Sequence, residues 1–236
     1  MDFFISTKNR TDKEELMDDF SIGGDLLRDT LDKLENINRW LGGNLMTVRA
    51  LKKVLKNHPK EQELTIADIG CGHGDILRDV AKFGRKNGYK MKLIGMDANP
   101  TAIAYANELS SEFSELSFKT EDIFSEAFKN RKFDVVLATL FLHHFKEAQL
   151  TSFLGNTLKQ TKIGIVVNDL HRHKLAYYLF MLLSVFIKNN MIIEDGLTSV
   201  LRGFKRNELA HISKKLKVKP QISWKWAFRF QWILKY

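Results

Sequence analysis

Residues 64–75 read Leu-Thr-Ile-Ala-Asp-Ile-Gly-Cys-Gly-His-Gly-Asp. The apolar residues at 64–69 have the length of one buried strand, and helix-forming sequence begins at Asp75 and continues through Lys86. Glycines at 70, 72 and 74 form a tight turn between these two elements, and their missing Cβ atoms let the backbone pass close beneath a ligand. This order of strand, glycine turn and helix opens a nucleotide-binding α/β fold.

The spacing of the glycines argues against a dinucleotide. A dinucleotide-binding turn reads G-x-G-x-x-G and places a pyrophosphate at the helix N-terminus. Here the third glycine, Gly74, comes one residue early, and the carboxylate of Asp75 would repel a pyrophosphate. Asp68 supplies a second carboxylate just before the turn. The turn therefore suits a ligand that has no phosphate and carries a positive charge.

Two segments resemble motifs of the class I S-adenosylmethionine-dependent methyltransferases. Residues 68–74 resemble motif I, and residues 95–100, Gly-Met-Asp-Ala-Asn-Pro, resemble motif II. The second resemblance implies that Asp97, at the end of a strand over residues 90–96, accepts hydrogen bonds from both ribose hydroxyls, with Ala98 beside it. Motif I implies a set of cofactor contacts from the turn and its flanks: Asp68, Gly70, Cys71, Gly72, Gly74 and Asp75.

The same resemblance extends along the next two strands. An acid that follows the strand at residues 116–120 is expected to face the adenine amino group. Asp122 is the first choice for this role, with Ile123 over one adenine face, and Glu121 is the alternative if the register slips by one residue. After the strand at 133–139, the resemblance implies cofactor contacts from Thr139 and Leu140.

Composition sets the broad class. The 236 residues, 44% of them hydrophobic, suffice for one large α/β domain with an N-terminal extension. Cys71 is the only cysteine, so no disulfide can form within the chain and a reducing compartment is expected. The N-terminus lacks the pattern of a signal peptide, and no run reaches the ~18 apolar residues that cross a bilayer. We therefore expect a cytoplasmic protein.

The net charge of +9 is concentrated in the C-terminal third. Residues 1–158 hold 22 basic and 24 acidic side chains, whereas residues 159–236 hold 15 basic and 4 acidic ones. This asymmetry indicates an anionic partner, either an acidic membrane surface, a nucleic acid or an anionic substrate. The alternative is a solvated basic face that keeps the protein soluble.

We divide the chain into a helical cap at residues 1–60 and a methyltransferase domain at 61–236. Helices are expected at residues 14–20, 25–41 and 45–56, because their apolar residues recur at helical spacing. By resemblance to small-molecule class I enzymes, the cap folds over the strand ends, and Trp40 either walls the site or packs as core. The domain is expected to hold a seven-stranded Rossmann-like sheet, order 3-2-1-4-5-7-6, with its last strand antiparallel.

Histidines follow the fourth and fifth expected strands, at 143–144 and at 171 and 173. Parallel strands bind ligands at their carboxyl ends, so these histidines are expected near the substrate. A histidine is a suitable base for a phenol or enol proton at neutral pH. His171 is the first choice and His144 the second, and Arg172 is a candidate to hold an anionic oxygen of the substrate. The spacing does not favour a metal site, and none is expected.

Residues 175–187 form the most apolar run, about 20 Å long as a helix and too short to cross a bilayer. Two interpretations stay open: a buried helix that forms a greasy substrate pocket, or a helix that rests on a membrane surface. Either interpretation favours a hydrophobic substrate. Residues 190–204 are expected to form a loop that closes over the site, with Arg202 as a contact for an anionic group.

Further segments, at 38–43, 168–178 and 195–196, resemble a bacterial group of small-molecule enzymes related to quinone and polyketide O-methyltransferases. The segment after residue 138 lacks the proline motif of DNA, RNA and glutamine N-methyltransferases. We therefore expect methyl transfer from S-adenosylmethionine to an oxygen, or to a carbon, of a hydrophobic phenolic, quinol or polyketide-like molecule. Weak contact with an anionic membrane, at its inner face, is expected, and nucleic acid is not. The alternatives are an RNA methyltransferase and a non-catalytic cofactor-binding regulator.

Overall fold

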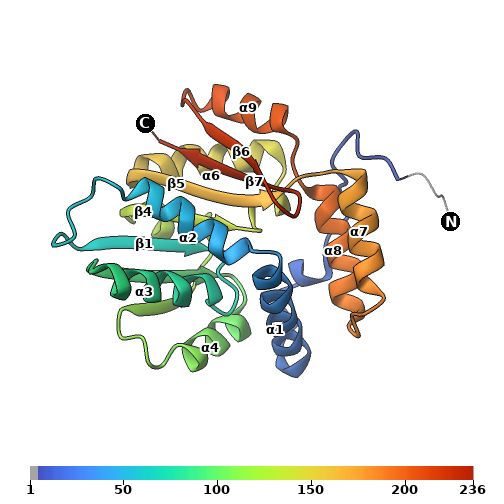
Figure 1. Ribbon diagram of the computed structural model, residues 1–236, viewed down its shortest axis with the longest axis horizontal. Helices are drawn as coiled ribbons and strands as arrows, with labels where there is room; N and C mark the ends of the chain where they lie inside the picture. Colours follow the sequence, from blue (N-terminus) through green and yellow to red (C-terminus); the bar gives the residue numbers. More distant parts are fainter. Residues whose placement is uncertain (1–4, 236) are drawn as a thin grey trace.

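The computed structural model describes residues 5–235. A seven-stranded sheet with the order β3-β2-β1-β4-β5-β7-β6 forms its centre (Figure 1). Neighbouring strands pair in parallel from β3 to β5, and β7 pairs antiparallel with both β5 and β6. The predicted order and the antiparallel last strand are confirmed. The strands are β1 (Leu64–Ile69), β2 (Met91–Asp97), β3 (Leu116–Thr120), β4 (Phe133–Thr139), β5 (Thr161–Leu170), β6 (Gln221–Lys225) and β7 (Arg229–Leu234).

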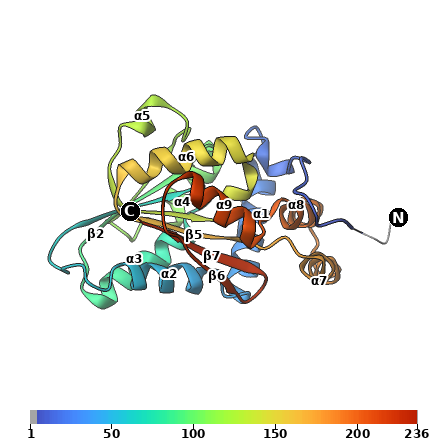
Figure 2. The same cartoon turned by 90° about the horizontal axis from the view of Figure 1, so that it is seen from above.

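Side chains of the central strands alternate between two apolar cores. In β1, Leu64 and Ile66 face one core, whereas Ala67 and Ile69 face the other, as the period of a strand requires. Helices α2 and α3 cover the first face, and α6 and α9 cover the second (Figure 2). Because both faces are covered, the strands read as continuous apolar runs, which is why the sequence predicted them well.

The helices begin and end close to the expected positions for most of the chain. Asn99 caps α4 through its side-chain oxygen, and Gly88 ends α3 in the left-handed conformation. The helices are α1 (Gly24–Trp40), α2 (Gly43–Val54), α3 (Asp75–Asn87), α4 (Pro100–Leu109), α5 (Glu126–Lys129), α6 (Glu147–Gln160), α7 (Lys174–Ser184), α8 (Asn190–Arg202) and α9 (Arg206–Lys215), with 3₁₀ turns η1 (Leu16–Asp18) and η2 (Leu142–His144).

Two expected elements differ. The segment at 190–204 is not a loop, because residues 190–202 form helix α8, which Asn189 caps by accepting a hydrogen bond from the backbone N–H of Ile192. The helix expected at residues 14–20 shrinks to the single turn η1. The backbone N–H groups of Leu16 and Met17, at the start of this turn, donate to the Asp195 carboxylate and so tie η1 to α8.

A cap lies over the carboxyl ends of the strands and consists of η1, α1, α7 and α8 (Figure 1). Helix α8 contacts η1, α1 and α7. Helix α2, which the sequence analysis assigned to the extension, packs instead on β5, β7 and α3 in the layer beside the sheet. The cap is therefore built from both ends of the chain rather than from residues 1–60 alone.

Two apolar features lie at the surface rather than in the interior. The side chain of Trp40 is 76% exposed, so it neither walls the site nor packs as core. Helix α7 buries only Ala176 fully, and Leu175, Leu179, Met181 and Leu182 are exposed, so residues 175–187 do not form a buried helix. Phe180 is half-buried and lines the cavity described below. Among residues 5–235, none of the helices has the length and apolarity that crossing a bilayer would need.

Candidate active site

The glycine turn lies between β1 and α3, at the carboxyl edge of the sheet. Gly70, Gly72 and Gly74 all adopt positive φ angles, a conformation that other residues rarely accept. The backbone N–H of Gly72 donates to Oδ2 of Asp97 at 2.9 Å, which ties the turn to the end of β2. The three glycines thus leave the backbone of the turn without side chains next to the carboxylate of Asp97.

Three carboxylates surround this turn. Asp68 is buried, and burial together with the charges of Asp75 and Asp97 raises its pKa well above the usual range. Burial also raises the pKa of Asp75, even though Asn44 donates to it at 2.9 Å. Burial raises the pKa of Asp97 as well, against the hydrogen bonds from Asn99 and Gly72. A cationic ligand would relieve this concentration of negative charge.

The turn fits the cofactor that the motifs imply. Oδ1 of Asp68 is buried and has no hydrogen-bond partner within residues 5–235, so it is free to accept from a ligand. Cys71 is buried in the turn, and Ala98 lies next to Asp97 at the same cavity. Gly72 has only Leu31 near the position of a Cβ, at 3.4 Å, so the space above it is open. An aminoacyl sulfonium matches the charge of this site.

The residues expected at the adenine line the same cavity. Glu121 forms an ion pair with Arg131 through contacts of 2.9 and 2.6 Å, so its carboxylate is already engaged. Asp122 is exposed at the cavity, and its carboxylate accepts only the N–H of Phe124, at 2.8 Å, among the described hydrogen bonds. Ile123 is half-buried beside it. This geometry favours Asp122 over Glu121 as the proposed adenine contact.

Thr139 and Leu140 end β4 beside the turn. The hydroxyl groups of Thr139 and Thr47 lie 3.1 Å apart, which joins β4 to helix α2. Leu140 has a φ of 52°, in the region that favours glycine, and its N–H donates to the carbonyl of Asn168 on β5. Backbone strain of this kind gathers at functional sites. Both residues line the cavity, as the predicted cofactor contact requires.

One cavity of about 1580 Å³ joins all these residues. Its floor is the glycine turn and the acidic side chains, and the rest of its lining combines apolar side chains with polar and charged ones such as His144, Arg202 and Arg229. Residues of the N-terminal segment at 10–18, which we call the strap, form part of its lining. The apolar walls come from the strap, α1, the segment after β4, α7 and α8: Met17, Leu27, Leu31, Leu34, Ile37, Phe141, Phe145, Phe180 and Val200.

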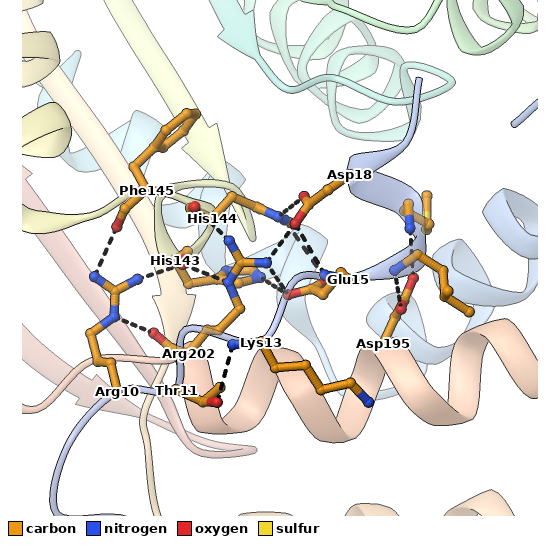
Figure 3. A network of polar contacts seen from close by, with 12 residues as sticks. Arg10, Thr11, Lys13, Glu15, Asp18, His143, His144, Phe145, Asp195 and Arg202 are labelled. Atoms are coloured by element: carbon orange, nitrogen blue, oxygen red, sulfur yellow. Dashed lines mark hydrogen bonds and ion pairs between the residues drawn. The ribbon is translucent and has the colours of Figure 1, made fainter. Parts of the chain in front are cut away.

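A polar network holds the strap against the strand ends (Figure 3). Nδ1 of His144 donates to Asp18 at 2.6 Å, and Arg202 donates to the same carboxylate at 2.6 Å. Arg10 donates to the carbonyl oxygens of His143, Phe145 and Arg202. Thus both ends of the strap are fixed to η2 and α8.

His143 lies at the centre of this network and is fully enclosed. Its Nδ1 donates to Asp169 on β5 at 2.7 Å, and its Nε2 lies 3.5 Å from Glu15 of the strap. Burial opposes a charge on this ring, but the two carboxylates outweigh burial and raise the pKa of His143 to about 9. The ring is therefore a cation at neutral pH, and it binds the strap to the sheet.

Two candidates from the sequence lie elsewhere. His171 is absent from the cavity lining, and its ring contacts those of His173 and Phe230 in tilted arrangements, while Trp224 donates to its Nδ1 at 3.3 Å. Burial and the nearby positive charges lower its pKa to about 4. His171 follows the carboxyl end of β5 and contacts the β6–β7 hairpin instead of the cavity. The structure therefore does not support His171, the first choice from the sequence, as the base.

Arg172 has a structural role instead of the predicted contact with substrate. Its side chain is fully buried and pairs with Glu208 at 2.5 Å. Its other hydrogen bonds reach the carbonyl oxygens of Thr7, Lys8 and Gly203. With its donors engaged and its side chain outside the cavity lining, Arg172 joins the N-terminal segment to α9. Arg202, from the segment expected to close over the site, does line the cavity, but it is paired within the protein.

His143 was expected near the substrate but without a role of its own, and Asp169, Glu15 and Asp18 were not among the residues predicted from the sequence. Glu15, His143 and His144 bring potential metal-ligand atoms within 4.8 Å of one another. Two features oppose a metal ion there: the protonated ring of His143, and the guanidinium of Arg202, 3.7 Å from Glu15. The expectation of no metal stays a prediction.

Comparison with known proteins identifies the class. A family model for the methyltransferase domain matches residues 60–194, more than half of the chain. The match covers the glycine turn, Asp97 and the residues at the end of β4. The chain therefore belongs to the S-adenosylmethionine-dependent methyltransferase family, as the motifs predicted.

Individual relatives are more distant. The ubiquinone biosynthesis O-methyltransferase of Rickettsia canadensis is 28% identical over 141 residues, which cover 58% of this chain and 56% of that protein. The chain thus spans about half the length of the curated relatives it matches. The plantazolicin methyltransferase BpumL, solved with S-adenosylhomocysteine, has a TM-score of 0.64 at 18% identity, covering 89% of this chain and 88% of that one. The citrinin polyketide synthase methyltransferase domain has a TM-score of 0.63 at 12% identity, covering 81% and 52%. These structures establish the fold.

Proposed function

We propose that the protein transfers the methyl group of S-adenosylmethionine to a hydroxyl oxygen of a hydrophobic phenolic, quinol or polyketide-like molecule. The apolar half of the cavity, beside the acidic turn, is the observation that carries the proposal. At about 1580 Å³ the cavity exceeds the roughly 300–1,000 Å³ of a typical small-molecule site. It therefore has room for an acceptor beside the cofactor, and the similarity to ubiquinone O-methyltransferases supports an oxygen acceptor.

The residues that would hold the cofactor are those of the turn. Asp68 and Asp75 would face its positively charged end, Asp97 the ribose, and Asp122 with Ile123 the adenine. When bound, S-adenosylmethionine supplies a methyl group that its sulfonium makes electrophilic. The chain must hold the acceptor oxygen in line with that group, at about 3 to 3.5 Å, and must exclude water. The strap, α1 and α8 contribute side chains to the lining of the cavity, which suits both tasks.

His144 is the proposed general base. Because a carboxylate only accepts hydrogen bonds, the contact with Asp18 fixes the proton of His144 on Nδ1 and leaves Nε2 to accept a proton. The side chain of His144 is 22% exposed at the cavity, whereas that of His143 is 3% exposed. His143 is also protonated at neutral pH, so it cannot accept a proton there. Asp18 belongs to the strap, and strap closure therefore orients the base.

A series of acceptors tests the proposal. We expect catechols and hydroquinols with alkyl chains of increasing length to show rising kcat/KM, because each added methylene is buried against the apolar walls, at about 0.8 kcal/mol each. The product should be a methyl ether, identified by mass spectrometry and proton NMR. A carbon-methylated product would be consistent with a methyltransferase but would refute transfer to oxygen. A rate that does not depend on chain length would refute binding of the acceptor by the apolar walls.

We further propose that helix α7 rests on an anionic membrane. Leu175, Leu179 and Leu182 are exposed and recur at helical spacing, so they form one apolar face of α7, and the exposed Phe186 follows in the turn after the helix. Exposed lysines lie at both ends of this run, at 174 and 188, in the basic third of the chain. Apolar side chains above a basic rim are typical of interfacial helices.

The membrane contact would give a lipid-soluble acceptor a path to the cavity. Phe180 of α7 packs against Gly196 of α8, and both residues line the cavity. The α7–α8 hairpin therefore connects the exposed apolar face to the site. Sedimentation with vesicles that contain phosphatidylglycerol should pellet the wild-type protein at low salt and less of it at high salt.

Matched variants sharpen this experiment. Leu182→Ser with Phe186→Ser should reduce pelleting, while Leu109→Ser, which changes an exposed leucine on α4, should not. Equal pelleting of all these proteins, or equal binding to neutral and anionic vesicles, would contradict the proposed contact.

A further inference from the structure

Arg229, the first residue of β7, is buried without a partner. It is 3% exposed, and its Nε and Nη1 atoms make no hydrogen bond to any of residues 5–235. No carboxylate of the described chain lies within ion-pair distance of it. Burial lowers the pKa of Arg229 to about 10, against the raising effect of the Asp169 charge, so the side chain is still a cation at neutral pH. An unpaired buried charge of this kind is costly unless a ligand completes it.

The other buried arginines differ from it. Arg78 donates to Glu35 and to the carbonyl of His73. Arg172 and Arg202 are likewise saturated by carboxylates and carbonyl oxygens, as described above. Arg229 is thus the exception among the buried arginines of residues 5–235, and it is one whose side chain lines the cavity.

The surroundings of Arg229 suit an anion. A Cβ placed on Gly43 would lie 2.6 Å from Nη1, so the guanidinium sits against the N-terminus of the twelve-residue helix α2, the positive end of its dipole. Asn38 approaches the same glycine, and its Oδ1 is buried without a partner, ready to accept from an ammonium or hydroxyl group. Two donor atoms without partners, Nε and Nη1 of Arg229, therefore lie near one acceptor without a partner, Oδ1 of Asn38.

We infer that Arg229 binds a carboxylate inside the cavity. Two ligands carry that group: the aminoacyl end of the cofactor, whose ammonium would suit Oδ1 of Asn38, and a carboxylated acceptor. A planar guanidinium matches a carboxylate through two parallel hydrogen bonds. The inference rests on the proposed function only in that both ligands belong to the same cavity.

Binding measurements with matched ligands test the inference. In calorimetry, S-adenosylhomocysteine is compared with 5′-methylthioadenosine, which lacks the carboxylate. With S-adenosylhomocysteine present, 3,4-dihydroxybenzoate is compared with its methyl ester. Arg229→Met should weaken one carboxylate ligand about 10- to 100-fold and leave its carboxylate-free analogue unchanged, and Arg229→Lys should recover part of the loss. Arg206→Met, at an exposed position, is the control.

The pair of ligands that responds identifies the source of the carboxylate. An equal loss for both members of each pair, or no loss for any ligand, would overturn the inference. Thermal unfolding adds a second readout: without ligand, Arg229→Met should be at least as stable as the wild type, because it removes an unpaired buried charge. A variant that fails to fold would assign Arg229 a structural role and refute us. If the wild type and Arg229→Met both bind 5′-methylthioadenosine, the cofactor site is intact. Refutation of the role of Arg229 would then leave the proposed function standing.

Discussion

The protonated imidazole of His143, which holds the strap against β5, should make the stability of the fold depend on pH. Burial opposes its charge, but Asp169 and Glu15 raise its pKa to about 9, compared with ~6.5 in an unfolded chain. Because the folded pKa is the higher one, the stabilisation is fully present below about pH 6.5 and is lost as the pH rises through about 9. The interval between the two pKa values corresponds to about 3 kcal/mol of unfolding free energy. Most of it, about 2 kcal/mol, should disappear between pH 7 and 9.5.

His143→Gln removes this titration while it keeps a donor for Asp169. Urea unfolding followed by tryptophan fluorescence, at intervals from pH 7 to 9.5, gives the unfolding free energy. The wild type should lose about 2 kcal/mol more than the variant over this range. His171→Gln is the matched control: the pKa of His171 is lowered to about 4, so this ring stays neutral throughout and the control should follow the wild type. Parallel pH profiles for the wild type and His143→Gln would refute the assignment of His143 as the buried cation.

Three further outcomes are expected. Asp97→Ala should weaken S-adenosylhomocysteine binding in calorimetry by about 1.5 to 3 kcal/mol for each charge-assisted hydrogen bond lost, and Gly72→Val should weaken it more by filling the open space above the turn; unchanged affinity in both would mean that the site lies elsewhere. Affinity for S-adenosylmethionine should fall as the pH is lowered through the raised pKa of Asp68 and its two neighbours, with protons released on binding near those values; calorimetry in buffers of different ionisation enthalpy checks this, and a flat pH profile would contradict it. His144→Ala should lower turnover by about 10² to 10⁴-fold without changing cofactor affinity, while His171→Ala should keep full turnover; the reverse pattern would restore the sequence-based choice of base.

The sheet and the cofactor turn were predictable because their determinants are local. Buried parallel strands read as apolar runs, and the three glycines with Asp68 and Asp97 leave few alternatives for the backbone between them. The strand order followed from resemblance to a known family, and pairing of the strands confirms it.

The acceptor side of the cavity was harder to predict because its contacts are long-range. His144 meets Asp18 across 126 residues, and Arg202 meets the same aspartate across 184. No spacing in the sequence reports such pairs. His171 and Arg172 attracted attention by following a strand end, but the antiparallel β7 and helix α9 cover that position and engage them.

The sequence left the place of the apolar run at 175–187 open between a buried helix and a helix on a membrane surface. Hydrophobicity alone cannot distinguish a helix in the core from one that faces a lipid surface, because both are apolar on most sides. Helix α7 has that composition and is largely exposed, with Phe180 at the cavity, whereas α8, which carries the buried Asp195 and Arg202, contributes several residues to the cavity lining.

The central claim is that the acidic turn and the apolar cavity serve transfer of a methyl group to a hydrophobic hydroxyl compound. The most direct test supplies S-adenosylmethionine with an isotopically labelled methyl group to the protein and an extract of cells that encode it, and then partitions the products. We predict label in an organic-soluble methyl ether, lost in the presence of excess S-adenosylhomocysteine. Label in RNA, or tight cofactor binding with no labelled product in any fraction, would contradict this claim.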